Sequence, residues 1–510
     1  MRKETAIKTA LASLTSVLLI FSFPNFLEPG VDYHTSILIW VAFVPLFYIW
    51  LGIKKTKGGF FLPFISAMIF YTGSLYWLCL VGPMGAAAYP ACIAVCAYFS
   101  FIIAMSFYLS ALLEEKTGIS VIFSLPALLT VTEFAREWLI SGWPILTPAQ
   151  SQHNFTQLML LLRFTGVPGA NFIIYSVNMA FAAIIAGEIK KFAAWENKLW
   201  IFICAALVLI TFIPRESYGQ ESKKITVAVL QRNIDQNVPW TTEYRRSVME
   251  VSREMARRAA YYKPVLYVWP ETAYPGILNI EPAGALETAS WDPNAFNLIG
   301  SDTAVTSSAV SKTDYYNGAY MISRDGKITG YYAKHHLVPF GEYIPFQDVI
   351  PFVRKVVQRY GYEGFKPGKE VAPFEFSGMS VGPLICFDSF FPEIASAQAR
   401  GGAQFLSHLS YESWYGESPA SAQIFTNAAL RSAECSLYLV RCVESGISGV
   451  VDDTGRIVLH TGLFTKELFS YDLNIANKPH ITFYSAHGDW FAWFLLIAVL
   501  SAAALKWKKR

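Results

Sequence analysis

The sequence predicts a membrane-spanning helical bundle joined to one large α/β domain, and composition and hydropathy lead to that prediction. Of its 510 residues, 53% are hydrophobic and 15% are charged, whereas about a quarter of an ordinary soluble domain is charged. The apolar excess, with a mean hydropathy of +0.34, is concentrated in residues 6–214 and 489–507. We therefore predict a membrane domain over residues 1–214, a folded domain over 222–478 and a final membrane helix over 489–507.

Apolar runs near the ~20 residues that a helix needs to cross a bilayer predict about eight spans. They are 6–26, 36–53, 59–80, 88–113, 119–140, 168–188, 197–214 and 489–507. The first run has no small-residue cleavage site behind it, so we interpret it as an anchor and not as a removed signal peptide. In the fifth run Glu133 and Arg136 have the spacing of an ion pair. The alternative is a functional role, because charges within a membrane are costly.

Basic residues in the short loops predict the orientation of the bundle. The first and third loops contain no lysine or arginine, and the fifth contains only Arg163. With eight spans, the remaining basic residues fall on one side, which the positive-inside rule assigns to the cytoplasm. We therefore expect both termini inside the cell and the folded domain outside the cytoplasm. The residues concerned are Arg2, Lys3, Lys8, Lys54, Lys55, Lys57, Lys116, Lys190, Lys191, Lys198 and the tail "KWKKR".

The folded domain alternates short β-branched runs with helical patterns, which predicts a layered α/β domain. Its strands are apolar almost throughout, as in sheets covered on both faces. Thr241 and Glu243 supply a helix start, and two turns, 324–326 and 453–455, predict hairpins. Strands are expected in 224–233, 265–271, 295–305, 317–336, 374–388, 403–410 and 437–460, and helices in 240–262 and 421–436.

Three of the seven cysteines, Cys386, Cys435 and Cys442, lie in the folded domain. An odd number leaves at least one thiol unpaired even if the domain forms a disulfide, which favours a reactive cysteine. No pair has the C-x-x-C spacing of a metal site, and we expect no cofactor. The net charge of +3 comes without a basic tract, so we expect no nucleic-acid partner.

Three predicted strands end on an ionisable residue where the chain turns: Glu271 in "VWPETAYP", Lys334 in "YYAKHH" and Cys386 in "LICFD". Each has an ordinary alternative, namely a helix cap, a solvated surface lysine and a small core residue. Sites in α/β sheets gather at the carboxyl ends of strands, where these three residues can meet. Glu271 would then accept the thiol proton of Cys386 as a general base. Lys334 and the backbone N–H of Phe387 would stabilise the thiolate and the oxyanion.

The segments "WPET", "YAKHHLVPFGEY" and "LICFD" resemble the Glu-Lys-Cys motifs of the carbon–nitrogen hydrolase (nitrilase) superfamily. Over essentially its whole length the chain resembles the apolipoprotein N-acyltransferase branch, in which a nitrilase-like domain lies between the seventh and eighth spans. "VTEFAREW", "AALRSAE" and "WYGES", which contains Trp414 and Tyr415, are also similar to that family. The resemblance implies a nitrilase-like α-β-β-α sandwich domain.

The resemblance implies a two-step acyl transfer at the outer leaflet of the cytoplasmic membrane. Cys386 would attack the sn-1 ester of a phospholipid such as phosphatidylethanolamine and form a thioester. The α-amine of a diacylglyceryl-cysteine apolipoprotein would then accept the acyl chain. We expect a monomeric inner-membrane enzyme with these two partners. The alternatives are a membrane-anchored amide or ester hydrolase that uses water as the acceptor, and a lipoprotein-binding paralogue with altered specificity.

Further residues follow from the same resemblance. Glu342 corresponds to a second glutamate that bonds Lys334 or steers the amine, and otherwise is a loop acid. Trp240, Trp414 and Tyr415 correspond to substrate-supporting aromatics, with Trp240 otherwise an ordinary packing residue. The apolar segment 343–370 predicts an arm that dips into lipid, or else a core segment.

Three positions depart from the family pattern. The pair after the cysteine is Phe387-Asp388, where a Tyr-Glu or Phe-Glu pair is usual. Residues 411–413, Tyr-Glu-Ser, replace a segment that begins Asn-Asp, and Val443-Glu444 replaces Thr-Asn. These changes leave Glu271, Lys334 and Cys386 intact. We expect any change in substrate preference to arise at these positions, first at Asp388.

Overall fold

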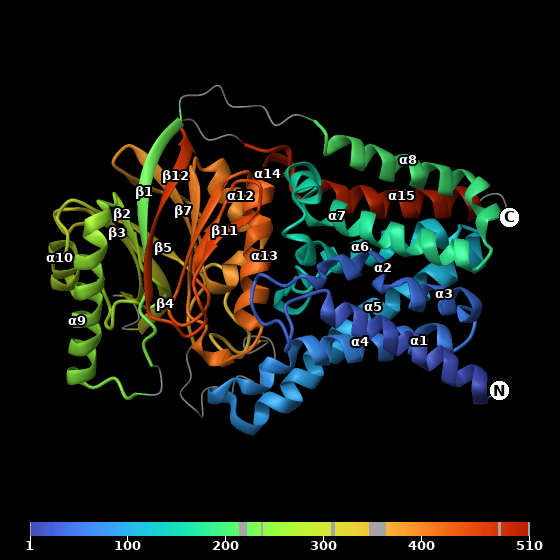
Figure 1. The fold of residues 1–510 in the computed structure, drawn as a ribbon, viewed down its shortest axis with the longest axis horizontal. Helices are drawn as coiled ribbons and strands as arrows, with labels where there is room; N and C mark the ends of the chain where they lie inside the picture. Colours follow the sequence, from blue (N-terminus) through green and yellow to red (C-terminus); the bar gives the residue numbers. More distant parts are fainter. Residues whose placement is uncertain are drawn as a thin grey trace. The chain divides into compact units, whose positions relative to one another are not determined.

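The computed structural model describes residues 2–213, 222–235, 238–307, 312–345, 364–477 and 481–507. The chain forms two compact units (Figure 1). A helical unit comprises Met1–Arg215, Trp414–Leu430 and His487–Arg510, and an α/β unit comprises Glu216–Ser413 and Arg431–Ala486. Residues 414–430 thus pack with the helices although they lie within the predicted domain 222–478. The predicted domain boundaries themselves stay predictions.

Five helical segments in the described part of the chain are long and apolar enough to cross a membrane. They are Glu4–Phe21, Thr35–Ile53, Gly58–Leu80, Gly85–Thr117 and Thr156–Ile185, while Val121–Ala135 and Trp490–Lys506 are apolar but shorter. The count of eight spans stays a prediction. The helices of this unit include α1 (Arg2–Phe21), α2 (Ile39–Ala42), α3 (Val44–Ile53), α4 (Gly58–Leu75), α5 (Ala88–Thr117), α6 (Val121–Ala135), α7 (Thr156–Ile185), α8 (Trp195–Ile210) and α15 (Trp490–Trp507).

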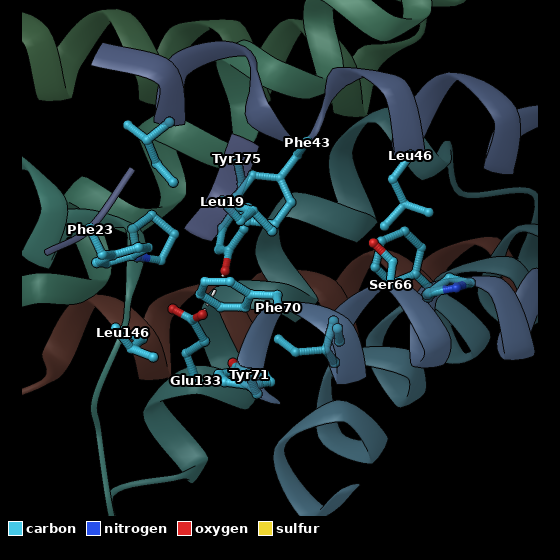
Figure 2. Close-up of a pocket in the computed structure, with 16 residues that line it drawn as sticks. Leu19, Phe23, Phe43, Leu46, Ser66, Phe70, Tyr71, Glu133, Leu146 and Tyr175 are labelled. Carbon is cyan, nitrogen blue, oxygen red and sulfur yellow. Dashed lines mark hydrogen bonds between the residues drawn. The ribbon is translucent and has the colours of Figure 1, made fainter. Parts of the chain in front are cut away.

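The buried charges of α6 do not pair with each other, contrary to the ion pair that their spacing allows. Glu133 accepts hydrogen bonds from Asn171 Nδ2 at 2.8 Å and from the Tyr175 hydroxyl at 2.6 Å. Arg136 donates to the Tyr71 hydroxyl at 2.6 Å. Glu133, Tyr71 and Tyr175 line an otherwise largely apolar pocket within the helical unit (Figure 2). Glu133 and Arg136 therefore bond to neutral hydroxyl and amide groups of neighbouring helices and not to each other.

The α/β unit contains two six-stranded sheets within its described residues. The first has the order β12-β1-β2-β3-β4-β5 and the second β11-β10-β9-β8-β7-β6. The strands are β1 (Ser222–Gln231), β2 (Leu266–Val268), β3 (Phe296–Ser307), β4 (Lys312–Ile322), β5 (Ile328–Ala333), β6 (Phe374–Phe376), β7 (Met379–Ile385), β8 (Phe405–Ser410), β9 (Tyr438–Val443), β10 (Gly449–Val451), β11 (Ile457–His460) and β12 (Glu467–Ala476). The helices are α9 (Thr242–Ala259), α10 (Pro282–Ser290), α12 (Pro392–Arg400), α14 (Phe483–His487) and α13 (Ala420–Cys435), whose first eleven residues group with the helical unit.

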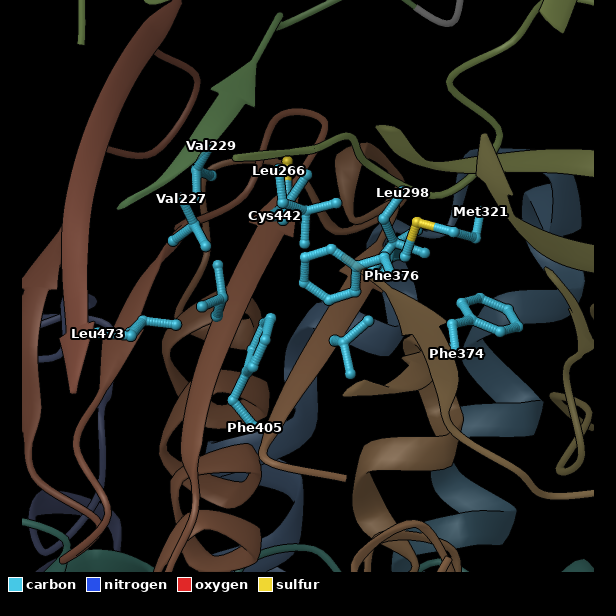
Figure 3. Close-up of a cluster of buried hydrophobic side chains, with 14 of the residues drawn as sticks. Val227, Val229, Leu266, Leu298, Met321, Phe374, Phe376, Phe405, Cys442 and Leu473 are labelled. Carbon is cyan, nitrogen blue, oxygen red and sulfur yellow. The ribbon is translucent and has the colours of Figure 1, made fainter. Parts of the chain in front are cut away.

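The two sheets pack face to face through one apolar core (Figure 3). Val227 and Leu298 of the first sheet belong to the same buried cluster as Phe405 of the second. Helices cover the outer faces, because Met255 of α9 packs with the outward residues of the first sheet. On the second sheet, Gln398 of α12 donates to a β7 carbonyl at 3.0 Å. This arrangement confirms the predicted α-β-β-α sandwich.

The local signals of the sequence specify the connections. The Thr241 hydroxyl accepts a hydrogen bond from the Tyr244 N–H and caps α9, as predicted. The β4–β5 hairpin turns at Gly326 and the β10–β11 hairpin at Gly455. Their φ values of 79° and 88° favour glycine. Both predicted hairpins are therefore confirmed. Parallel pairing of β1 with β2 and of β7 with β8 places strand ends at common sheet edges.

Candidate active site

The three ionisable residues predicted at strand ends occupy those positions in the structure. Lys334 follows β5 directly, Cys386 follows β7 directly, and Glu271 lies three residues beyond β2. Lys334 is 1% exposed and Glu271 5%. Lys334 Nζ lies 3.4 Å from Glu271 Oε1, and the charges of both residues act on the Cys386 thiol. The roles of these residues remain those that the sequence predicts.

Glu342 and Asn317 complete the polar group around Lys334. Lys334 Nζ lies 2.8 Å from Glu342 Oε1, the closer of its two carboxylate partners. Asn317 Nδ2 donates to Glu271 Oε1 at 2.6 Å and to Glu342 Oε1 at 3.1 Å. The Val338 N–H donates to the other oxygen of Glu342 at 2.8 Å. Sequence reasoning missed Asn317, which is one of several polar residues in β4 and has no distinguishing local signal.

Burial and charge set the protonation states at this site. Burial raises the pKa of the Cys386 thiol, Glu271 raises it further, and Lys334 opposes this. Burial likewise raises the pKa of Glu271, against the effect of Lys334. For Lys334 burial acts to lower the pKa, but its anionic neighbours raise it well above the ordinary value. Cys386 is therefore a neutral thiol at rest and needs a base when it attacks.

Cys386 adopts a backbone conformation that is uncommon for a residue with a side chain, with a φ of 47°. Its carbonyl oxygen accepts hydrogen bonds from Ser389 Oγ and His408 Nε2, each at 3.0 Å. These bonds hold the strained turn, as expected at functional sites. All seven cysteines of the chain are free thiols, Cys386 included.

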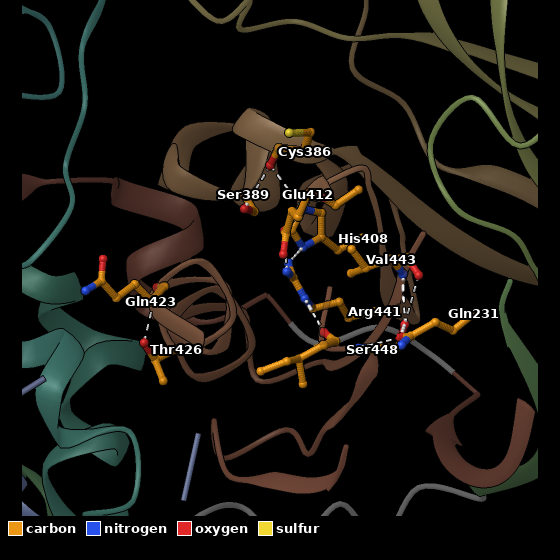
Figure 4. A network of polar contacts seen from close by, with 12 residues as sticks. Gln231, Cys386, Ser389, His408, Glu412, Gln423, Thr426, Arg441, Val443 and Ser448 are labelled. Atoms are coloured by element: carbon orange, nitrogen blue, oxygen red, sulfur yellow. Dashed lines mark hydrogen bonds and ion pairs between the residues drawn. The ribbon is translucent and has the colours of Figure 1, made fainter. Parts of the chain in front are cut away.

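A buried chain of polar side chains leads to the carbonyl of Cys386 (Figure 4). Arg441 forms an ion pair with Glu412 and donates to His408 Nδ1 at 2.8 Å. Burial and the adjacent Arg441 lower the pKa of His408 well below its ordinary value. His408 is thus neutral with its proton on Nε2, which donates to Cys386. Glu412, one of the departures from the family pattern, anchors this chain.

Asp388 is fully buried and bonded to main-chain and hydroxyl donors. Its Oδ1 accepts hydrogen bonds from the His335 and His336 N–H groups at 3.1 and 2.8 Å. Its Oδ2 accepts from the Tyr332 hydroxyl at 2.8 Å and from the Ile385 N–H at 3.1 Å. Asp388 therefore ties the segment after Lys334 to the end of β7. This geometry supports a bracing role and not direct substrate contact.

The remaining departure from the family pattern, Glu444, has a partner of opposite charge within the chain. Glu444 Oε2 lies 2.5 Å from Arg232 Nη2, and both side chains are buried. The Ile234 N–H donates to Glu444 Oε1 at 3.0 Å. A glutamate in place of the family's asparagine therefore forms a buried ion pair within this chain. Sequence reasoning did not connect Arg232 with Glu444.

The predicted aromatic residues have separate surroundings. Phe387 is buried and packs against Phe391, with ring centroids 5.2 Å apart. Trp240 is 42% exposed and its ring contacts that of Tyr244. No described contact brings Trp240 to Glu271, Lys334 or Cys386, so its substrate role stays a prediction.

Trp414 and Tyr415 belong to the helical unit, where the Tyr415 ring lies 4.7 Å from that of Trp77. Trp414 is 38% exposed. Their roles likewise stay predictions. Most of the segment 343–370, predicted to enter lipid, lies outside the described residues.

Two glycines lie directly behind the predicted catalytic residues. A Cβ atom on Gly300 would come within 2.7 Å of the Glu271 Cα and 2.6 Å of the Pro270 oxygen. A Cβ atom on Gly368 would come within 2.2 Å of the Ala333 oxygen, next to Lys334. Both positions therefore require glycine for close backbone approach. The sequence gives no local sign of this requirement.

Comparisons with known proteins match both halves of the chain. Residues 226–477 match the carbon-nitrogen hydrolase family, and residues 15–180 match the apolipoprotein N-acyltransferase N-terminal domain. An apolipoprotein N-acyltransferase from Geobacter metallireducens is 30% identical over 515 residues, covering 98% of this chain and 95% of the relative. The chain belongs to the apolipoprotein N-acyltransferase family.

Other members of the apolipoprotein N-acyltransferase family are also similar over nearly the full length. Apolipoprotein N-acyltransferase 2 from Treponema denticola is 27% identical, covering 96% of this chain and 95% of its own. Among solved structures, Saccharomyces cerevisiae Nit3, a member of branch 10 of the nitrilase superfamily, is 19% identical, with a TM-score of 0.38. It covers 54% of this chain and 97% of its own.

Proposed function

We propose that this chain transfers an acyl chain from the sn-1 position of a phospholipid, through a thioester on Cys386, to the α-amine of a diacylglyceryl-cysteine apolipoprotein. The observation that carries the proposal is the Glu271–Lys334–Glu342 group beside Cys386 in a member of this family. The match of residues 15–180 to the family's N-terminal domain supports a lipid-linked acceptor over a small soluble amide.

In the first step the Cys386 sulfur attacks the ester carbonyl carbon while Glu271 accepts the thiol proton. The positive charge of Lys334 and the backbone N–H of Phe387 stabilise the oxyanion. The carbon–oxygen bond then breaks, and the departing lysophospholipid oxygen takes the proton from Glu271. Glu342 and Asn317 hold Lys334 and Glu271 in place through this cycle.

In the second step the acceptor amine attacks the thioester carbonyl carbon. A carbon–nitrogen bond forms, the carbon–sulfur bond breaks, and Glu271 conveys a proton from nitrogen to the Cys386 sulfur. We also propose that the catalytic domain lies on the outer side of the cytoplasmic membrane, where both lipid substrates are accessible.

The proposal is tested with purified full-length protein and phosphatidylethanolamine. We expect a hydroxylamine-sensitive acyl adduct in the intact mass spectrum of the wild type and of Cys435→Ser, a matched buried-cysteine control. Cys386→Ser should lack this adduct. Transfer of the acyl chain to a diacylated lipopeptide distinguishes a transferase from a hydrolase. No adduct on the wild type, or release of free fatty acid with no transfer, would overturn the proposal.

A further inference from the structure

Asp302 lies beside the site but is not part of the predicted catalytic set. It pairs directly with Asn317 across the antiparallel β3–β4 ladder. Directly paired residues have side chains on one face of the sheet, with Cβ atoms about 5 Å apart. Asn317 donates to both Glu271 and Glu342. Asp302 therefore lies on the same face as the two carboxylates that flank Lys334.

Two oxygen atoms on this face have no donor among the described residues. Asp302 Oδ1 is buried and makes no hydrogen bond. Asn317 Oδ1 is also buried without a partner, on a side chain that is only 4% exposed. Buried acceptors without donors are rare and costly. Two of them on neighbouring residues therefore indicate that a ligand donates hydrogen bonds to them.

The charge balance indicates a cationic ligand. Lys334 is the one ammonium group within ion-pair distance of Glu271 and Glu342 in the described structure. Asp302 adds a third carboxylate, and burial followed by the charge of Glu342 raises its pKa to about 6. No group of three His, Cys, Asp or Glu side chains within the described residues is arranged to hold a metal ion. A compact organic cation with several N–H donors fits this charge and these acceptors.

We propose that Asp302, with Asn317 Oδ1 beside it, binds the primary ammonium group of a substrate. The proposal rests on the proposed function and names the residues that receive this group. The ammonium has two possible sources, which are the α-amine of the acceptor and the headgroup of phosphatidylethanolamine. Both present three N–H donors and one positive charge.

When the ammonium belongs to the acceptor, Asp302 also takes the proton that this group must lose before it attacks. The freed amine forms the carbon–nitrogen bond with the thioester carbonyl, and the carbon–sulfur bond breaks. The second nitrogen proton passes through Glu271 to the Cys386 sulfur. Asp302 then releases its proton to water, which restores the starting state.

The test compares Asp302→Asn, which keeps the shape and removes the charge, with Asp314→Asn. Asp314 is a partly buried acid on the same strand as Asn317. Three rates are measured separately: thioester formation from phosphatidylethanolamine, thioester formation from phosphatidylglycerol, and decay of the preformed thioester on adding a diacylated lipopeptide. Asp302→Asn should slow only one of these rates, the one whose substrate places its ammonium at Asp302. The decrease should be on the order of 10- to 100-fold, the effect of losing one charge-assisted hydrogen bond.

Slower decay with the lipopeptide assigns the ammonium to the acceptor, and slower thioester formation from phosphatidylethanolamine alone assigns it to the donor headgroup. Asp314→Asn should match the wild type in all three rates. The Asp302→Asn protein should unfold at or above the wild-type temperature, because it loses a negative charge whose buried Oδ1 atom has no donor. Equal rates in Asp302→Asn and wild type, equal slowing of all three, or a lower unfolding temperature would overturn the proposal. A wild type that forms no thioester would instead refute the proposed function.

Discussion

At the scale of single residues, burial determines how this site is used. The Cys386 thiol has a raised pKa because it is buried and lies near the negative charge of Glu271. The resting side chain is therefore a thiol and not a thiolate. Lys334 keeps its charge because Glu271 and Glu342 contact it, although burial opposes that charge. The base is therefore the group whose protonation limits the first step.

This protonation predicts a pH dependence for thioester formation. Glu271 accepts a proton only as a carboxylate, and burial raises its pKa above the ordinary glutamate value. Activity should therefore rise as the pH increases through that raised pKa, with the acid limb above the usual range of a glutamate. Single-turnover rates across the acidic range measure this limb. An acid limb at the ordinary glutamate pKa would contradict the assignment.

Glu271→Gln should reduce the rate of thioester formation by about 10²- to 10⁴-fold, the usual contribution of a general base, and should abolish the acid limb. The reason is that glutamine has the shape of glutamate and can still accept the hydrogen bond from Asn317, but it cannot take a proton. Glu281→Gln, at an exposed acid outside the site, is the control and should keep the wild-type profile. Wild-type rates in Glu271→Gln would show that another group is the base.

At the scale of elements, the site depends on backbone segments that approach each other closely. Gly300 of β3 touches the backbone at Glu271, and its N–H donates to the Pro270 carbonyl at 3.2 Å. The Gly368 N–H donates to the Lys334 carbonyl at 2.8 Å. The segments that carry the base and the ammonium are thus positioned by neighbouring main chain as well as by side chains.

Gly300→Ala should displace the Glu271 backbone, because the added Cβ would lie within 2.7 Å of three backbone atoms there. We expect thioester formation to fall at least 10-fold and the unfolding free energy to fall by about 1–3 kcal/mol, as for overpacked cores. Gly52→Ala, where a Cβ meets nothing within 4 Å, is the control. A Gly300→Ala protein with wild-type rates and unfolding temperature would contradict this prediction, because it would show that β3 moves with no loss of stability or activity.

Asp388→Ala should destabilise the α/β unit without changing lipid preference. It leaves the N–H groups of His335, His336 and Ile385 buried without their acceptor. The loss should be on the order of 3–5 kcal/mol, measured by thermal unfolding in detergent. Glu375→Ala, at an exposed acid of β6, should unfold like the wild type. A normal unfolding temperature with altered donor preference would instead make Asp388 a specificity residue.

The elements predictable from the sequence were those with local signals. Alternation of β-branched runs and helical patterns predicts a layered α/β domain, while its two-sheet sandwich followed only from the family resemblance. The ionisable residues Glu271, Lys334 and Cys386 stand out because each ends a predicted strand. The supporting contacts were not predictable, because they join distant residues. Glu444 and Arg232 are 212 positions apart, and His408 and Arg441 are 33 apart. The register of β8 against β9 brings His408 to Arg441, and the packing of one sheet on the other brings Arg232 to Glu444; no local pattern encodes either.

At the scale of the whole molecule, the division into units does not follow the chain order. Residues 414–430, from the middle of the carbon–nitrogen hydrolase match, pack in the helical unit. Gln423 shows why, because its side chain accepts a hydrogen bond from Trp77 and donates to the carbonyls of Pro24 and Ser74. A buried glutamine satisfied by three partners fixes this segment among the helices. The carbon–nitrogen hydrolase match therefore includes a segment that belongs to the helical unit.

The orientation of the whole chain gives a last prediction. The basic loops around residues 54–57 and 190–198 predict cytoplasmic termini and an external catalytic domain. Green fluorescent protein fused after residue 510 should fluoresce, because it folds in the cytoplasm. Alkaline phosphatase, which is active only outside the cytoplasm, should be active when fused after residue 222. It should be inactive when fused after residue 118, at the end of α5 that carries Lys116 and is predicted to be cytoplasmic. An inactive fusion at 222, or an active one at 118, would place the catalytic domain on the cytoplasmic side and remove its access to the outer leaflet.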